Sequence, residues 1–187
     1  MKKSFLRSQS GMAAIEAAFI LPLMSLIYFS MIDVVELITS NRRMTSIAST
    51  VSDTISQYQT TIQRATVIDI FNAKDIIMPT ATQQANVHVD VYGYYMKNGA
   101  PTPRWNVGNG IGPACNAPDT TGYAALMAGG NDIIVSVSCM TYSPVITQFM
   151  GSNLMGSTSF VINQSIVSRL RSTPTLTCMN GAAVCTS

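Results

Sequence analysis

Hydrophobic residues are concentrated in one long run near the N-terminus. From Met12 to Ile32, roughly twenty residues contain a single charge, Glu16. At 1.5 Å per residue, such a run forms about 30 Å of helix, which matches the hydrocarbon thickness of a bilayer. We therefore expect a membrane-spanning helix. Pro22 removes one backbone hydrogen bond inside it and is expected to kink it.

The helical pattern continues beyond this run as an amphipathic stretch. Apolar residues recur at spacings of mostly three and four, so the helix is predicted to extend outward as a stalk to about residue 57. A second apolar pattern predicts a short helix over about residues 63–77, which ends before Pro79. The apolar positions of the stalk are Leu37, Ile38, Met44, Ile47, Ala48, Val51, Ile55 and Tyr58.

From residue 86 the period of the pattern changes to two, which is typical of half-buried strands. Val87, Val89 and Val91 alternate with polar or amphipathic residues. Strands are also expected at residues 131–143, where Pro144 ends the pattern, and at 157–168, with a short one at 104–107 around Trp105. Residues 108–130 are rich in Gly, Pro and Asn and predict a long irregular loop, residues 145–150 one helical turn, and the residues after 169 a polar tail.

These elements predict an α+β fold. It consists of a long N-terminal transmembrane and stalk helix, a short second helix and a small antiparallel β-sheet domain. The expected organisation is a basic leader at residues 1–11, the transmembrane helix and stalk at 12–57, and an extracytoplasmic domain at 58–187.

Charges on either side of the apolar run predict its orientation. Lys2, Lys3 and Arg7 precede the run, whereas Asp33 and Glu36 are the first charges after it. The positive-inside rule then puts the N-terminus in the cytoplasm and residues 58–187 outside it. A cleaved secretory signal peptide is the alternative, but the run is long for one, carries a carboxylate and lacks an A-x-A site.

Composition argues against several functional classes. The 187 residues carry a net charge of +2 and no polybasic run, so nucleic acid is not an expected partner. No G-x-S-x-G or H-E-x-x-H motif is present, and His88 is the single histidine, so we expect neither an enzyme nor a small-molecule substrate. We expect no metal or other cofactor, and His88, in an alternating strand pattern, is interpreted as structural.

The four cysteines all follow the apolar run, on the side where thiols oxidise. Cys115, Cys139, Cys178 and Cys185 allow three disulfide connectivities. Cys178 and Cys185 bracket a short loop and pair most economically with each other, which would leave Cys115 for Cys139.

Glu16 allows two interpretations. A carboxylate at the centre of a span costs about 2.5–3.5 kcal/mol on insertion scales, and such residues commonly mark function. Glu16 lies only five residues after Gly11, so it can also be a tolerated residue near the membrane interface. The functional interpretation uses the order of a basic leader, Gly11, Glu16 and then unbroken hydrophobicity.

That order resembles the class III signal peptides of type IV pilins, and the chain resembles the TadE-like family of minor pilins or pseudopilins of the bacterial tight-adherence (Tad, or Flp) pilus. The segment G-M-A-A-I-E-A-A-F-I-L-P-L at 11–23 carries the specific part of the resemblance. Residues 49–57, 68–79 and 135–144 and the hairpin with Trp105 are similar in pattern only. Ala17 departs from the family, since processed pseudopilins typically have an aromatic residue after the glutamate.

The resemblance implies a structural role in pilus assembly and adherence, including biofilm formation. A prepilin peptidase would cut between Gly11 and Met12, and Glu16 would pair with the amino terminus of a neighbouring subunit during assembly. The implied partners are the membrane, other pilin or pseudopilin subunits and the Tad secretion machinery. The implied location is the inner membrane, with the C-terminal domain in the periplasm or, after assembly, in the pilus. An uncleaved assembly scaffold and a minor type IVb pilin or adhesin are the alternatives.

Overall fold

The computed structural model describes residues 9–110, 112, 115–127, 129–146, 159–171 and 174–185, with the backbone alone for residues 9–13. The basic residues of the leader lie outside this part of the chain, as do residues 147–150 and 157–158 of the expected helical turn and last strand. The fold is α+β, as predicted, with a long N-terminal helix, small sheets and two disulfides. Two compact units are present, Met1–Ile38 with Ser143–Ser159, and Thr39–Tyr142 with Phe160–Ser187.

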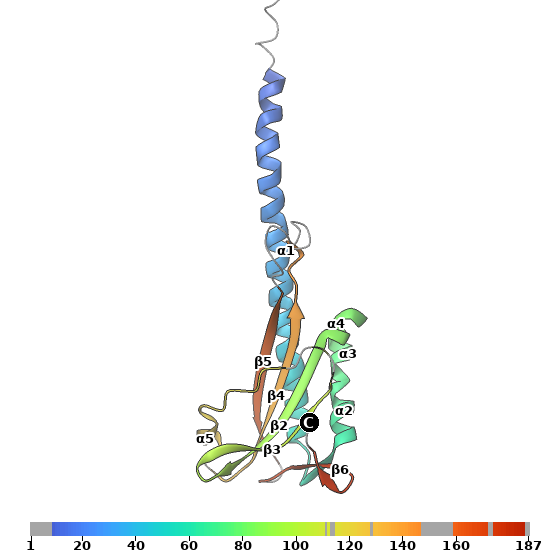
Figure 1. Ribbon diagram of the computed structural model, residues 1–187, viewed down its shortest axis with the longest axis vertical. Helices are drawn as coiled ribbons and strands as arrows, with labels where there is room; N and C mark the ends of the chain where they lie inside the picture. The colour runs from blue at the N-terminus through green and yellow to red at the C-terminus, as the bar shows by residue number, and fades with distance from the viewer. Residues whose placement is uncertain are drawn as a thin grey trace, which may run out of the picture. The chain divides into compact units, whose positions relative to one another are not determined.

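The predicted transmembrane and stalk segments form one helix, α1 (Gln9–Ser56), of 48 residues (Figure 1). It continues through Pro22, whose carbonyl oxygen accepts a hydrogen bond of 2.8 Å from Ser25 Oγ. The sequence prediction of a continuous helix to about residue 57 is confirmed.

The second part of α1 supplies a buried stripe to the second unit. Met44, Ile47, Ala48, Val51 and Ile55 are fully buried, at the spacings of three and four that put residues on one helix face. Ser138 Oγ, from a central strand, donates a hydrogen bond of 2.8 Å to the carbonyl oxygen of Met44. The amphipathic segment is therefore the helix that covers one face of the main sheet.

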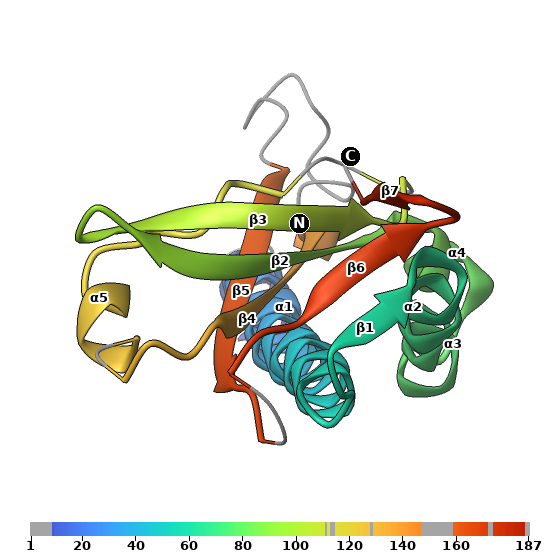
Figure 2. The same ribbon diagram turned by 90° about the horizontal axis from the view of Figure 1, so that it is seen from below.

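The main sheet has four antiparallel strands in the order β3-β2-β4-β5 (Figure 2). Each of the predicted strands is present, and those predicted from residue 86 and at 104–107 are longer than predicted. Both faces of β4 are covered, so Ile134 is buried as fully as its neighbours Ile133 and Val135, which explains why β4 departs from simple alternation. The strands are β2 (Val87–Lys97), β3 (Ala100–Gly108), β4 (Ile133–Tyr142) and β5 (Phe160–Arg169).

The loop predicted at residues 108–130 covers the other face of this sheet. It contains one short helix that the sequence did not predict, α5 (Tyr123–Leu126). Tyr123 and Met127 from this loop are buried against the strands and join Tyr94 in one core cluster. The strand residues of that cluster are Ile133, Val135 and Val137.

The predicted second helix is interrupted in the structure. It forms α2 (Arg64–Phe71) and α3 (Ala73–Ile77), and α4 (Ala81–Asn86) follows. At Asn72 the backbone N–H donates to the carbonyl oxygen of Asp69 at 3.1 Å, an i−3 bond that tightens the chain and ends α2. Thr80 caps α4, because its hydroxyl accepts a hydrogen bond of 3.3 Å from the backbone N–H of Gln83.

The polar tail is more regular than predicted. A second sheet with the order β1-β6-β7 joins β1 (Thr61–Gln63) in parallel to β6 (Thr177–Asn180), which forms a hairpin with β7 (Ala183–Val184). Gly181 adopts φ +63° in the hairpin turn, a conformation that favours glycine. Strands of two to four residues are too short to produce a period-two signal, so the sequence pattern did not reveal this sheet.

Candidate functional site

The most unusual surface in the first unit is the apolar part of α1. Large hydrophobic side chains from Ile15 to Met31 are exposed, Phe19 by 78 % and Leu21 by 67 %. The 18-residue apolar stretch of this helix is not buried at all within the chain. Exposure to water of so much contiguous apolar area is costly, at about 25 cal/mol per Å². This part of α1 is a candidate membrane anchor.

The residues predicted for processing and assembly lie at the start of this helix. Gly11 and Met12 are within the first turn of α1, and the structure describes only their backbone. Glu16 is exposed, and among the described residues its carboxylate has no hydrogen-bond or ion-pair partner. Five residues of helix separate Glu16 from Gly11 by about 7.5 Å along the axis.

A second carboxylate, Asp33, marks the end of the apolar run and has a different environment. Its side chain is buried, and its two oxygens accept hydrogen bonds from the backbone N–H groups of Val145 at 2.6 Å and Ile146 at 3.0 Å. These two N–H groups lie at the start of a helical turn, so Asp33 acts as a cap supplied from another segment. Sequence reasoning identified Asp33 only as a charge after the span, because its partners lie more than a hundred residues away.

The four cysteines form two disulfides. Cys115 is bonded to Cys139 and Cys178 to Cys185, which is the economical pairing among those that the sequence allowed. The first bridge attaches the loop before α5 to the central strand β4, across a sequence separation of 24 residues. In the chain-entropy model a loop of this length contributes on the order of 3 kcal/mol.

The Cys115–Cys139 bridge lies beside a pair of ionisable side chains. His88 and Asp90 are two residues apart on β2, so they project from the same face of the sheet. His88 Nε2 lies 3.1 Å from Asp90 Oδ1, and Cys115 Sγ lies 3.6 Å from the carbonyl oxygen of His88. Burial raises the pKa of Asp90, although the neighbouring His88 opposes this shift. The sequence indicated a structural role for His88 and did not predict that it meets Asp90 and Cys115.

A cavity of about 370 Å³ lies in the second unit where β2 and β3 pair. Its arginine is already engaged, because Arg104 Nη2 lies 3.3 Å from the carboxylate of Asp132 and the guanidinium lies 4.7 Å from the centroid of the Tyr95 ring. Burial raises the pKa of Tyr94 to about 12, so this phenol stays protonated near neutral pH. The lining offers no acid and base pair, and consists of Tyr92, Tyr94, Pro103, Arg104, Trp105, Asn106, Ala117 and Cys185.

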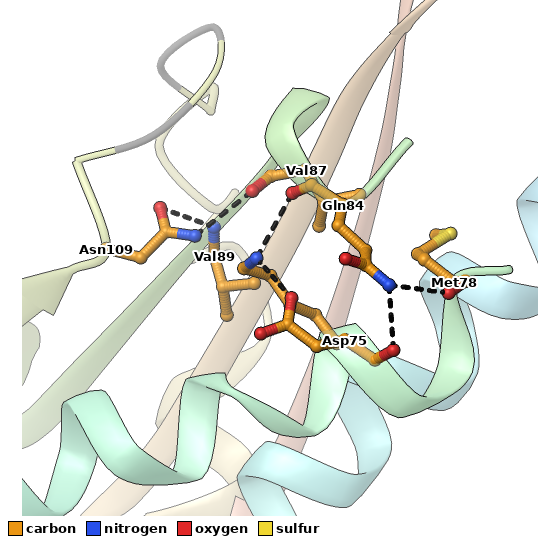
Figure 3. A network of polar contacts seen from close by, with 7 residues as sticks. Asp75, Met78, Gln84, Val87, Val89 and Asn109 are labelled. Carbon is orange, nitrogen blue, oxygen red and sulfur yellow. Dashed lines mark hydrogen bonds and ion pairs between the residues drawn. The ribbon is translucent and has the colours of Figure 1, made fainter. Parts of the chain in front are cut away.

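A buried lysine is also engaged in structural contacts (Figure 3). Lys74 Nζ lies 2.7 Å from Asp75 Oδ1 and donates to the carbonyl oxygen of Gln84 at 3.1 Å. Gln84 Nε2 in turn donates to the carbonyl oxygens of Asp75 and Met78. These bonds connect α3 to α4 and satisfy a charge that would be costly to bury alone.

Asn109 extends the pairing of β2 beyond the end of β3. Its side-chain amide accepts a hydrogen bond from the N–H of Val89 at 3.3 Å and donates to the carbonyl oxygen of Val87 at 3.0 Å (Figure 3). The side chain thus takes the place of a strand residue, and its role is structural.

The apolar part of α1 with Glu16 is therefore the candidate functional surface of the first unit, and the group around the Cys115–Cys139 bridge is the candidate site of the second. Comparisons of the chain with protein-family models, with curated proteins and with solved structures find no match.

Proposed function

We propose that this protein is a minor pilin or pseudopilin-like subunit for assembly of a type IV pilus of the Tad (Flp) class. In this proposal α1 anchors the chain in the bacterial inner membrane before assembly and packs against the helices of other subunits afterwards. The α+β domain lies on the periplasmic side and makes the outer contacts that support adherence.

One observation carries the proposal. Glu16 is an exposed, unpartnered carboxylate among the described residues, set near the start of an exposed apolar helix and five residues after Gly11. An isolated charge in such a helix is costly unless a partner of opposite charge meets it. A new amino terminus on a neighbouring subunit, created by cleavage after Gly11, is a cation that would meet Glu16 when the two helices are displaced along their axes by about 6 Å, the rise of four helical residues.

The continuity of α1 is consistent with this role. The same helix provides both an exposed apolar segment and a buried stripe that holds the sheet. The segment that would contact other subunits and the stripe that packs on the sheet therefore belong to one continuous, regularly hydrogen-bonded helix.

Substitution of Glu16 tests the proposed assembly contact. Glu16→Ala makes the apolar run more hydrophobic, so membrane insertion should persist, while recruitment into pili should fall roughly tenfold or more, which corresponds to loss of an ion pair of about 1.4 kcal/mol. The measurement is the amount of subunit in membranes and in sheared pili, by mass spectrometry. Normal piliation by an inserted Glu16→Ala protein would contradict the proposed pairing.

Glu36→Ala is the matched control, because Glu36 is an exposed glutamate on the same helix beyond the apolar run. It should leave recruitment unchanged. The same spectra report the N-terminus: cleavage after Gly11 yields a chain that begins at Met12. An intact leader on protein found only in the inner membrane would indicate an assembly scaffold instead.

A further inference from the structure

We propose that the reduced form of the Cys115–Cys139 pair binds one zinc ion together with His88 and Asp90. The donor set would comprise two thiolates, one imidazole and one carboxylate, which are the ligands that Zn²⁺ takes in tetrahedral sites. This inference does not depend on the proposed function in pilus assembly.

The geometry brings the donor atoms close enough for a shared ion. The ligand atoms of His88, Asp90 and Cys115 all lie within 4.8 Å of one another, and His88 Nε2 is 3.1 Å from Asp90 Oδ1. Bonds to zinc of about 2.0–2.3 Å in tetrahedral geometry separate pairs of ligands by about 3.3–3.8 Å. Small side-chain rotations therefore suffice to bring these donors to one ion.

Cys139 supplies the fourth donor from the adjacent strand. It lies directly opposite His88 in the β2–β4 register and is fully buried, and its Cα is 5.5 Å from that of Cys115. Its sulfur lies outside the group of donor atoms that are within 4.8 Å of one another, so once the bond between the two sulfurs is broken the Cys139 side chain must rotate toward the ion. The four ligands would then come from β2, β4 and the loop before α5.

The proposed ligands are largely shielded from solvent. The side chains of His88 and Asp90 are exposed by only 10 % and 16 %. Gly108 on β3 lies opposite Asp90, and a Cβ there would collide with the Asp90 carboxylate and lie 3.5 Å from His88 Nε2. The absence of a side chain at Gly108 thus allows the Asp90 carboxylate to occupy the place that a Cβ would take.

The site is available only after reduction, because a disulfide sulfur is not a thiolate. A phosphine reductant supplies the two electrons that break the bond between the sulfurs. The phosphine takes the oxygen atom of a water molecule and becomes a phosphine oxide. The two hydrogen atoms of that water are transferred to Cys115 and Cys139, which become thiols. Zinc binding then releases both thiol protons, and His88 binds the ion as a neutral imidazole. Before oxidation, the ion would hold Cys115 and Cys139 together and away from Cys178 and Cys185.

The test uses the full chain in detergent micelles, reduced with a phosphine and titrated with Zn²⁺ without oxygen. We expect one ion per chain, lost again on reoxidation. Co²⁺ in place of zinc should show thiolate-to-cobalt charge transfer and the intense visible bands of tetrahedral coordination. Equal binding by oxidised and reduced protein would overturn the proposal.

Variants identify the ligands. Replacement of both Cys115 and Cys139 by serine should abolish zinc binding. The matched replacement of Cys178 and Cys185 by serine should preserve it. Among the described residues, the Cys178–Cys185 bridge has no cluster of His, Asp or Glu side chains beside it. His88→Ala and Asp90→Asn should each weaken affinity roughly tenfold or more. Circular dichroism checks their folding, and Asp90→Asn retains the size of the side chain. Zinc affinity within about twofold of wild type in folded His88 and Asp90 variants would contradict the assigned ligands.

Discussion

At the scale of single residues, the buried charges of the second unit each have specific partners. Asp132 accepts from Arg104, and its backbone N–H donates to the carbonyl oxygen of Pro174 at 2.7 Å. Desolvation raises the pKa of Asp132, although Arg104 and the backbone N–H of Leu176 lower it in part. Burial therefore outweighs the ion pair at this carboxyl, in agreement with the high cost of removing a charge from water.

This balance predicts how stability depends on pH. Because the folded pKa of Asp132 is raised, the folded state binds its proton more tightly than the unfolded state does. The stability of wild type relative to Asp132→Asn should thus be greatest below the unfolded pKa of about 3.8 and fall as pH rises through the folded pKa. Thermal melts of both proteins across this range provide the measurement.

Asp119 provides the control, because its pKa is shifted in the opposite direction to that of Asp132. The Thr121 hydroxyl and backbone N–H hydrogen-bond its carboxylate and lower its pKa. The stability of wild type relative to Asp119→Asn should therefore fall as pH decreases through the folded pKa. The same pH dependence for both pairs would contradict the assignment of burial as the main cause at Asp132.

At the scale of elements, the Trp105 indole connects the main sheet to the tail. Its Nε1–H donates a hydrogen bond of 2.9 Å to the carbonyl oxygen of Leu176, just before β6. Trp105 lies opposite Gly93 in the β2–β3 register, and the indole occupies the space where a side chain at Gly93 would lie. A glycine inside a central strand is thus explained by the close approach of an aromatic ring.

Gly93→Ala should therefore destabilise the domain by about 1–3 kcal/mol, since the added methyl group must displace a buried indole. Gly129→Ala is the control, because its added Cβ would meet no atom nearer than 3.8 Å. The control should change stability by about 0.5 kcal/mol or less. Chemical denaturation with tryptophan fluorescence measures both, since Trp105 is the single tryptophan. Equal stability of the two variants would contradict the packing of Trp105 on Gly93.

The sequence predicted those elements whose pattern is local and long. The period of α1 is visible over several turns and the alternation of β2 over residues 87–92, and both elements are present. The interruption at Asn72 and the parallel pairing of β1 with β6 depend on contacts between distant or very short segments, which no periodicity encodes. For the same reason, His88, Asp90 and Cys115 can be read from the sequence, but their proximity in the fold cannot.

At the scale of the whole molecule, the charges around the apolar run predict the topology of the chain. A reporter that works only outside the cytoplasm, fused after Ser187, should be active. Replacement of Lys2, Lys3 and Arg7 by glutamate should reduce that activity, because the basic flank that holds the N-terminus inside is lost. Lys97→Glu, a reversal of a single charge far from the span in sequence, should have no effect. Activity of a cytoplasmic reporter at the same fusion point would contradict the orientation.

The continuity of α1 also determines where the chain can be divided. A soluble fragment that begins at residue 58 would lack Met44, Ile47, Val51 and Ile55, and would expose the sheet face that they cover. At about 1.5–3 kcal/mol each, the loss of four fully buried side chains amounts to about 6–12 kcal/mol, which is comparable to the total stability of a typical small domain. A fragment that begins at Thr39, where the second compact unit starts, retains this stripe and omits most of the exposed apolar surface. Expression of the second unit as a separate fragment therefore requires the last five turns of α1.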